Sequence, residues 1–149
     1  MSEGSDRAGF AGNVSVEHAF DRLSAEAAAT LIDVRTRAEW SYVGVPDLTV
    51  LGKEPVLVEW QSWPTGAVAA DFVGTLEAAL AARGVAKGAP LYFICRSGAR
   101  SHAAALAMAA AGHGPCFNVA DGFEGPLDGA RHRGASGGWK AAGLPWVQT

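Results

Sequence analysis

The 149-residue sequence has few large apolar side chains. Hydrophobic residues make up 49% of the chain, but 30 of its residues are alanine and another 19 are glycine. A core must therefore form through close contacts between secondary-structure elements around a few large residues. The formal net charge of −3 excludes the strongly charged composition that is typical of disordered chains. We expect one compact domain, because a chain of this length normally forms one.

The sequence also lacks the features of membrane and secreted proteins. Its longest uninterrupted apolar run, residues 103–111, is much shorter than the roughly 20 residues that span a bilayer. The opening segment MSEGSD has neither the basic start nor the apolar stretch of a secretory signal. Two cysteines are too few for a disulfide framework. These absences predict a cytoplasmic protein without membrane contact, in which thiols stay reduced.

Positive charge is scarce overall but concentrated in the second part of the chain. Residues 1–94 carry seven basic and twelve acidic side chains, whereas residues 95–149 carry five basic and three acidic ones. The mildly acidic total argues against nucleic-acid binding. Four of the five basic residues are arginines, which bind oxyanions through a fork of donors, and they are Arg96, Arg100, Arg131 and Arg133. For Arg131 and Arg133 we favour the alternative of a solvated surface.

Strands are expected to alternate with helices along the chain. Apolar residues at helical spacing predict helices over 16–28, 71–83 and 97 or 98 to 111, with one or two helical turns at 37–42. Short apolar runs predict strands at 31–34, 56–59, 91–94 and 116–119. This alternation is typical of an α/β fold with a mostly parallel sheet and helices on both faces. We expect a flexible N-terminus over 1–13 and a domain over 14–149.

The strongest candidate site begins at Cys95, directly after the most apolar predicted strand. Ligands of α/β sheets bind at the carboxyl ends of the strands, which is where this thiol is expected. The backbone N–H groups of the following helix and nearby guanidinium groups favour a thiolate over a thiol. Small residues allow the loop to close around an anion, and the loop comprises Arg96, Ser97, Gly98, Ala99 and Arg100. The alternative is a buried, unreactive cysteine.

Five segments together resemble the single-domain rhodanese (thiosulfate sulfurtransferase) family, and they are residues 31–35, 44–46, 95–100, 118–123 and 138–145. The resemblance implies a rhodanese-like fold with a central five-stranded sheet. It also implies that Cys95 accepts a sulfane sulfur from thiosulfate as a persulfide and passes it to cyanide, a thiol or a protein. The loop from Arg96 to Arg100 would bind the thiosulfate oxyanion, and no metal or organic cofactor is implied. Many family members have GHIPG where this chain has GVPDL, so no pocket histidine is inferred.

Two further functions remain as alternatives. The domain could carry or display a persulfide to a partner protein without catalysing turnover. A phosphatase or arsenate reductase is less favoured, because related enzymes place five residues between the cysteine and the arginine. Only four residues separate Cys95 from Arg100 here, which makes a smaller cradle for a tetrahedral anion.

Other residues receive structural interpretations first. Asp33 is expected to accept hydrogen bonds from backbone or from an arginine such as Arg35 or Arg100, and Glu39 could act in the same way. Asp33 and Arg35 are expected to support the site. Trp60 and Trp63 could wall the pocket or pack in the core with about equal weight. His102 is interpreted as a solvated helix residue and Cys116 as a small buried hydrophobe. The role of His132, between two arginines, stays open.

Overall fold

A central sheet of five parallel strands organises the protein. The computed structural model describes residues 9–62 and 65–148. In the order β1-β6-β5-β2-β4, every neighbouring pair of strands is parallel. The strands are β1 (Phe10–Val14), β2 (Thr30–Asp33), β4 (Val56–Leu57), β5 (Leu91–Ile94) and β6 (Cys116–Val119). The predicted α/β class with a mostly parallel five-stranded sheet is therefore confirmed.

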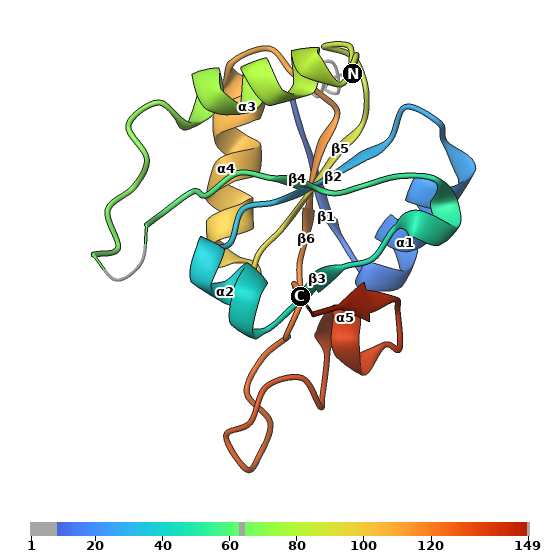
Figure 1. The fold of residues 1–149 in the computed structure, drawn as a ribbon, viewed down its shortest axis with the longest axis vertical. Coiled ribbons are helices and arrows are strands. Elements are labelled where there is room, and N and C mark those ends of the chain that lie inside the picture. Colours follow the sequence, from blue (N-terminus) through green and yellow to red (C-terminus); the bar gives the residue numbers. More distant parts are fainter. Residues whose placement is uncertain (1–8, 63–64, 149) are drawn as a thin grey trace.

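Helices cover both faces of this sheet (Figure 1). The helices are α1 (Val16–Ala25), α2 (Arg37–Tyr42), α3 (Phe72–Ala82), α4 (Ala99–Ala110) and α5 (Gly138–Ala141). Buried side chains of α3 and α4 pack on one face, and those of α1 and α5 pack on the other. A second, antiparallel sheet pairs β3 (Val45–Pro46) with β7 (Trp146–Val147). In the part of the chain that the structure describes, no helix is both long and apolar enough to cross a bilayer.

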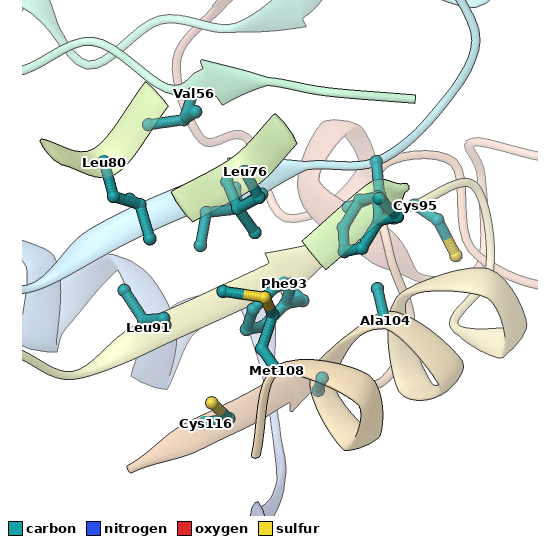
Figure 2. Packing of buried hydrophobic residues seen from close by; sticks show 13 residues of the cluster. Val56, Leu76, Leu80, Leu91, Phe93, Cys95, Ala104, Met108 and Cys116 are labelled. Atoms are coloured by element: carbon teal, nitrogen blue, oxygen red, sulfur yellow. The ribbon is translucent and has the colours of Figure 1, made fainter. Parts of the chain in front are cut away.

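Strand β5 shows how the sequence distributes side chains between the two faces. Successive side chains of a strand point to opposite sides of the sheet. Leu91, Phe93 and Cys95 accordingly belong to the cluster beneath α3 and α4, which Figure 2 shows from close by. Tyr92 and Ile94 belong to the cluster beneath α1 and α5. The unbroken apolar run 91–94 thus reflects burial on both faces, as expected for a central parallel strand.

The first strand corrects the predicted domain boundary. Residues 10–13, expected in a flexible N-terminus, form most of β1 and pair with β6 at the edge of the sheet. Alanine and glycine inside the segment FAGNV dilute the apolar pattern, so the strand depends on pairing with β6 rather than on its own composition. Residues 1–8 of the same predicted segment lie outside the described residues.

Two other predicted elements are shorter than expected. The first helix ends at Ala25 rather than near residue 28, and the strand predicted at 56–59 ends at Leu57. Beyond Leu57 the chain still follows the sheet, because the N–H groups of Val58 and Trp60 donate to the carbonyl oxygens of Asp33 and Val34 at 3.1 and 3.2 Å. Both differences fall at element ends, which are the least sharply defined parts of helices and strands.

Candidate active site

Cys95 lies directly after β5, at the carboxyl end of the central strand. Its side chain is buried, with 1% of the residue exposed. The backbone N–H groups of Gly98 and Ser101 donate to Cys95 Sγ at 3.1 and 3.3 Å, and Ser101 Oγ lies 3.2 Å from the same sulfur. Donors that converge on a sulfur stabilise negative charge on it. The arrangement is therefore suited to a thiolate or another anionic sulfur.

Gly98 gives the loop its shape. Its φ of 112° lies in the left-handed region, where a side chain is strained, and a Cβ at this position would clash with the carbonyl oxygen of Ala120. The segment that follows β6 holds the loop from outside: the N–H groups of Phe123 and Glu124 donate to the carbonyl oxygens of Cys95 and Arg96 at 2.8 and 3.0 Å. The N–H of Gly98 is thereby directed at the sulfur.

A polar chain, buried at Ser101 and Asn118, runs from the sulfur to the edge of the sheet and was not predicted from the sequence. Ser101 Oγ lies 2.6 Å from Asn118 Oδ1, and Asn118 Nδ2 donates to Asn13 Oδ1 at 2.9 Å. The serine has one hydroxyl hydrogen, so it donates either to Asn118 or to Cys95 at a given moment. An asparagine inside an otherwise apolar strand was a usable signal for this chain, whereas Ser101 had none beyond its place after the loop.

Asp33 and Arg35 form a fully buried ion pair beside this loop. Arg35 Nη2 donates to Asp33 Oδ2 at 2.7 Å and also to the carbonyl oxygen of Gly44 at 2.7 Å. The guanidinium carbon lies 4.3 Å from the centre of the Phe123 ring. The pair therefore joins the end of β2 to the start of β3 and to the segment that braces the Cys95 loop. Asp33 accepts from Arg35, as the sequence analysis expected.

Arg100 pairs with Glu39, which was expected to accept from an arginine. Its guanidinium donates to both carboxylate oxygens of Glu39, at 2.7 and 3.0 Å. Burial raises the pKa of Glu39, but hydrogen bonds from Arg100 and Thr36 outweigh it and lower this pKa to about 2. The same pairing raises the pKa of Arg100. Arg100 thus links the first turn of α4 to α2. Among the described residues, the donors to Cys95 Sγ are in Gly98 and Ser101, not in the Arg100 guanidinium.

A cavity of about 1130 Å³ opens beside the Cys95 loop. Its wall includes four arginines and two exposed apolar side chains, and these are Arg96, Arg100, Arg131, Arg133, Tyr42 and Leu127. Cys95 itself does not line the cavity, so its sulfur lies behind the loop. Both arginines for which we favoured a solvated surface therefore reach this cavity.

The interpretation of Trp60 as a pocket wall is wrong. Its ring packs edge-on against Phe72 at 5.0 Å between centroids, as part of the core beneath α3, and it does not line the cavity. The aromatic ring is thus used in packing, which was the alternative for this residue. Trp63 lies outside the described residues.

Cys116 is a buried hydrophobe, as expected. It is fully buried, and burial raises its pKa to about 12. Figure 2 shows its sulfur and that of Cys95 at opposite ends of the cluster, which fits their places at the start of β6 and after the end of β5.

His102, expected to be solvated, is half-buried instead and its ring lies 5.0 Å from that of Phe10. Within residues 9–62 and 65–148, no cluster of three or more histidine, cysteine or acidic side chains could hold a metal ion.

Comparisons with known proteins agree with a rhodanese-like fold. The family model described as "STR4 middle domain" matches residues 11–149, and the chain belongs to this family. An uncharacterized protein of Rickettsia conorii is 35% identical over 134 residues, which cover 90% of this chain and 95% of that protein. The rhodanese-like domain-containing protein 4 of Arabidopsis thaliana is 26% identical over 134 residues, which make up 25% of its length.

Two solved structures share the architecture. The crystal structure of Rv0390 from M. tuberculosis has 45% sequence identity and a TM-score of 0.83, and the match covers 94% of this chain and 99% of that one. The polysulfide-sulfur transferase homodimer of Wolinella succinogenes has 23% identity and a TM-score of 0.57, over 97% of this chain and 83% of that one. The second likeness concerns the fold alone. The chain therefore has an α/β fold that the polysulfide-sulfur transferase shares.

Proposed function

We propose that the protein is a sulfurtransferase that carries a sulfane sulfur as a persulfide on Cys95. The observation that carries this proposal is the convergence of the Gly98 and Ser101 N–H groups on the Cys95 sulfur. Thiosulfate is the proposed donor, and cyanide or a thiol is the proposed acceptor. The likeness of the fold to that of a polysulfide-sulfur transferase supports the same class of chemistry.

The first step transfers sulfur to the enzyme. The Cys95 thiolate attacks the outer sulfur of thiosulfate, a new S–S bond forms at Sγ, and the S–S bond of thiosulfate breaks. Sulfite leaves with the electron pair of the broken bond. The donors around Sγ hold negative charge on the persulfide that results. No oxidant is needed, because the sulfane sulfur keeps its oxidation level.

The second step returns the enzyme to its starting form. Cyanide, or the thiolate of an acceptor, attacks the outer sulfur of the persulfide, and the bond from Sγ to that sulfur breaks with its electron pair on Sγ. Thiocyanate or the acceptor's own persulfide leaves. Because Cys95 is 1% exposed, both steps require the thiol to turn toward the cavity or the segment 96–97 to move aside.

Intact mass after incubation with thiosulfate tests the proposal. Wild-type protein is expected to gain the mass of one sulfur atom and release sulfite. Cys95→Ala is expected to lose the gain, whereas Cys116→Ala is expected to keep it, because Cys116 lies at the other end of the core. A gain that survives in Cys95→Ala would contradict the mechanism, as would wild-type protein that never gains sulfur.

Two further assays separate the alternatives. Added cyanide should remove the sulfur as thiocyanate through many turnovers. A stable persulfide that neither cyanide nor thiols discharge would favour a carrier without turnover instead. Release of phosphate from an aryl phosphate, with loss in Cys95→Ala, would favour a phosphatase.

A further inference from the structure

The cavity beside the Cys95 loop is much larger than the proposed donor needs. Thiosulfate has about five non-hydrogen atoms, and even at the roughly 30 Å³ that one water molecule occupies in the liquid they would fill about 150 Å³. The cavity measures about 1130 Å³, slightly above the range of roughly 300–1,000 Å³ for pockets that hold drug-sized molecules. Its volume therefore points to a second, larger substrate.

The charge of the wall indicates the chemistry of that substrate. The wall contains four arginines and two glutamates. The charge of Glu39 is balanced by its ion pair with Arg100, so the wall has one further carboxylate, Glu124, and three further arginines. Among these, Arg133 donates to the carbonyl oxygen of Gly125 at 2.8 Å. Within the described part of the chain, Arg96 and Arg131 are exposed and have no ion pair or side-chain hydrogen bond, so two guanidinium groups remain for a ligand.

Arg131 is held over the cavity by an ordered turn. The Asp128 carboxylate accepts from the N–H groups of Ala130 and His132, both at 2.8 Å, and the N–H of Arg131 donates to the carbonyl oxygen of Asp128 at 2.9 Å. In this turn Arg131 has a φ of 64°, which favours glycine or asparagine over arginine. A long cationic side chain at such a position suggests that the side chain is used.

We propose that the sulfur acceptor is a small thiol that carries at least two carboxylates, bound by Arg96 and Arg131. The inference rests on the proposed sulfurtransferase activity. Each guanidinium can bind one carboxylate through two parallel hydrogen bonds, and Tyr42 and Leu127 contact the aliphatic part of the acceptor. The acceptor releases its thiol proton to solvent and attacks, as a thiolate, the outer sulfur of the Cys95 persulfide. The bond to Sγ breaks with its pair on Sγ, and the acceptor leaves as a persulfide.

Single-turnover transfer tests the acceptor class. Protein preloaded with thiosulfate and freed of excess reagent is mixed with glutathione, with glutathione diethyl ester or with cyanide, and loss of the added sulfur is followed by intact mass. Glutathione carries two carboxylates that the ester lacks, and both have the same thiol. Glutathione is expected to discharge the persulfide at least fivefold faster than the ester at low ionic strength. Equal rates for the acid and the ester would overturn the proposal.

Substitution at position 131 tests the assigned residue. Arg131→Asn removes the charge with a residue that tolerates a positive φ, and Arg131→Lys keeps the charge. Arg131→Asn is expected to lower the rate ratio of glutathione to cyanide at least fivefold, with less loss in Arg131→Lys. Lys87→Gln, a charge removal on an exposed residue outside the cavity, is the matched control. An equal effect of Arg131→Asn and Lys87→Gln on the ratio would overturn the assignment.

A binding measurement separates failure of this inference from failure of the proposed function. S-methylglutathione cannot accept sulfur, so its binding to the wild-type protein does not depend on the chemistry at Cys95. Calorimetric titration is expected to show binding that weakens at least fivefold in Arg131→Asn. A protein that gains no sulfur but binds this probe would refute only the proposed function, whereas a persulfide-forming protein without such binding would refute only the acceptor.

Discussion

The two cysteines differ because of what surrounds each sulfur. Both are buried, but Cys95 Sγ accepts N–H donors at the first turn of α4, whereas burial among apolar side chains raises the pKa of Cys116 to about 12. The thiolate is the reactive form of cysteine. Burial alone therefore does not decide which of the two thiols reacts.

Alkylation should distinguish the two thiols. At pH 8 the pKa of about 12 leaves Cys116 ionised in only about one molecule in 10⁴. We therefore expect iodoacetamide to modify Cys95 in the folded protein and to spare Cys116, as measured by peptide mapping. Cys95→Ala should stay unmodified under the same conditions, and urea should expose both thiols in the wild type. Preferential labelling of Cys116 in the folded protein would contradict this account.

Gly98 should be the least replaceable residue of the loop. In Gly98→Ala the Cβ would clash with the Ala120 carbonyl oxygen, and the φ of 112° would be strained. We expect a loss of at least about 2 kcal/mol in the free energy of unfolding, together with slower alkylation of Cys95, because the Gly98 N–H is displaced from the sulfur. Gly88→Ala, with nothing within 4 Å of the added Cβ, is the control, and equal effects of the two substitutions would contradict the role of the loop.

At the scale of elements, Glu39 links two helices that flank the site. Its carboxylate accepts from the Thr36 N–H at the start of α2 and from both ends of the Arg100 fork in α4. The side chains of Glu39 and Arg100 are each 19% exposed, so the pair is partly shielded from water. The pair therefore fixes the position of α2 beside the cavity.

Glu39→Gln should destabilise the protein in a pH-dependent way. The folded-state pKa of about 2 is lower than the ordinary 4.5, so the carboxylate contributes stability above pH 4.5 and loses it as the pH falls toward 2. We expect a loss of about 2 kcal/mol at pH 7 that shrinks between pH 4.5 and 2, as measured by urea unfolding. Glu54→Gln, at an exposed site, should change stability little at any pH, and a pH-independent loss in Glu39→Gln would contradict the linkage.

At the scale of the whole molecule, net charge and local charge have opposite signs. The chain carries a formal −3, yet the cavity wall carries more arginines than glutamates. An anion that approaches the site experiences mainly the nearby charges, because salt screens those farther than about 10 Å at 0.1 M. The local field, not the total, should therefore govern donor association.

The dependence of the sulfur-loading rate on ionic strength should show whether local positive charge or net negative charge governs the association of thiosulfate. If the cavity attracts thiosulfate, the second-order rate of sulfur loading falls as sodium chloride increases from low to physiological concentration, by about threefold or more. Arg96→Gln should reduce this dependence, and Lys87→Gln should leave it as in the wild type. Net repulsion by the acidic chain predicts the opposite slope, so a rate that rises with salt would contradict the local account.

The alternation of strands and helices and the place of Cys95 after β5 follow from local properties of the sequence. An unbroken apolar run over 91–94 requires burial on both faces, and small residues after Cys95 allow a tight loop, because these are local properties of the chain. The parallel sheet and the position of Cys95 at its edge could therefore be predicted. Strand β1 could not, since its composition is weak and its pairing partner β6 lies about a hundred residues away.

Which side chains come into contact depends on how the elements pack together. Glu39 and Arg100 are separated by 61 residues, and the polar chain from Cys95 ends at Asn13, 105 residues before Asn118. Tertiary packing also places Trp60 against Phe72 in the core and Arg131 in the wall of the cavity. Such contacts arise from the way helices and loops pack over the sheet, and neither periodicity nor local composition encodes the distance between two remote side chains.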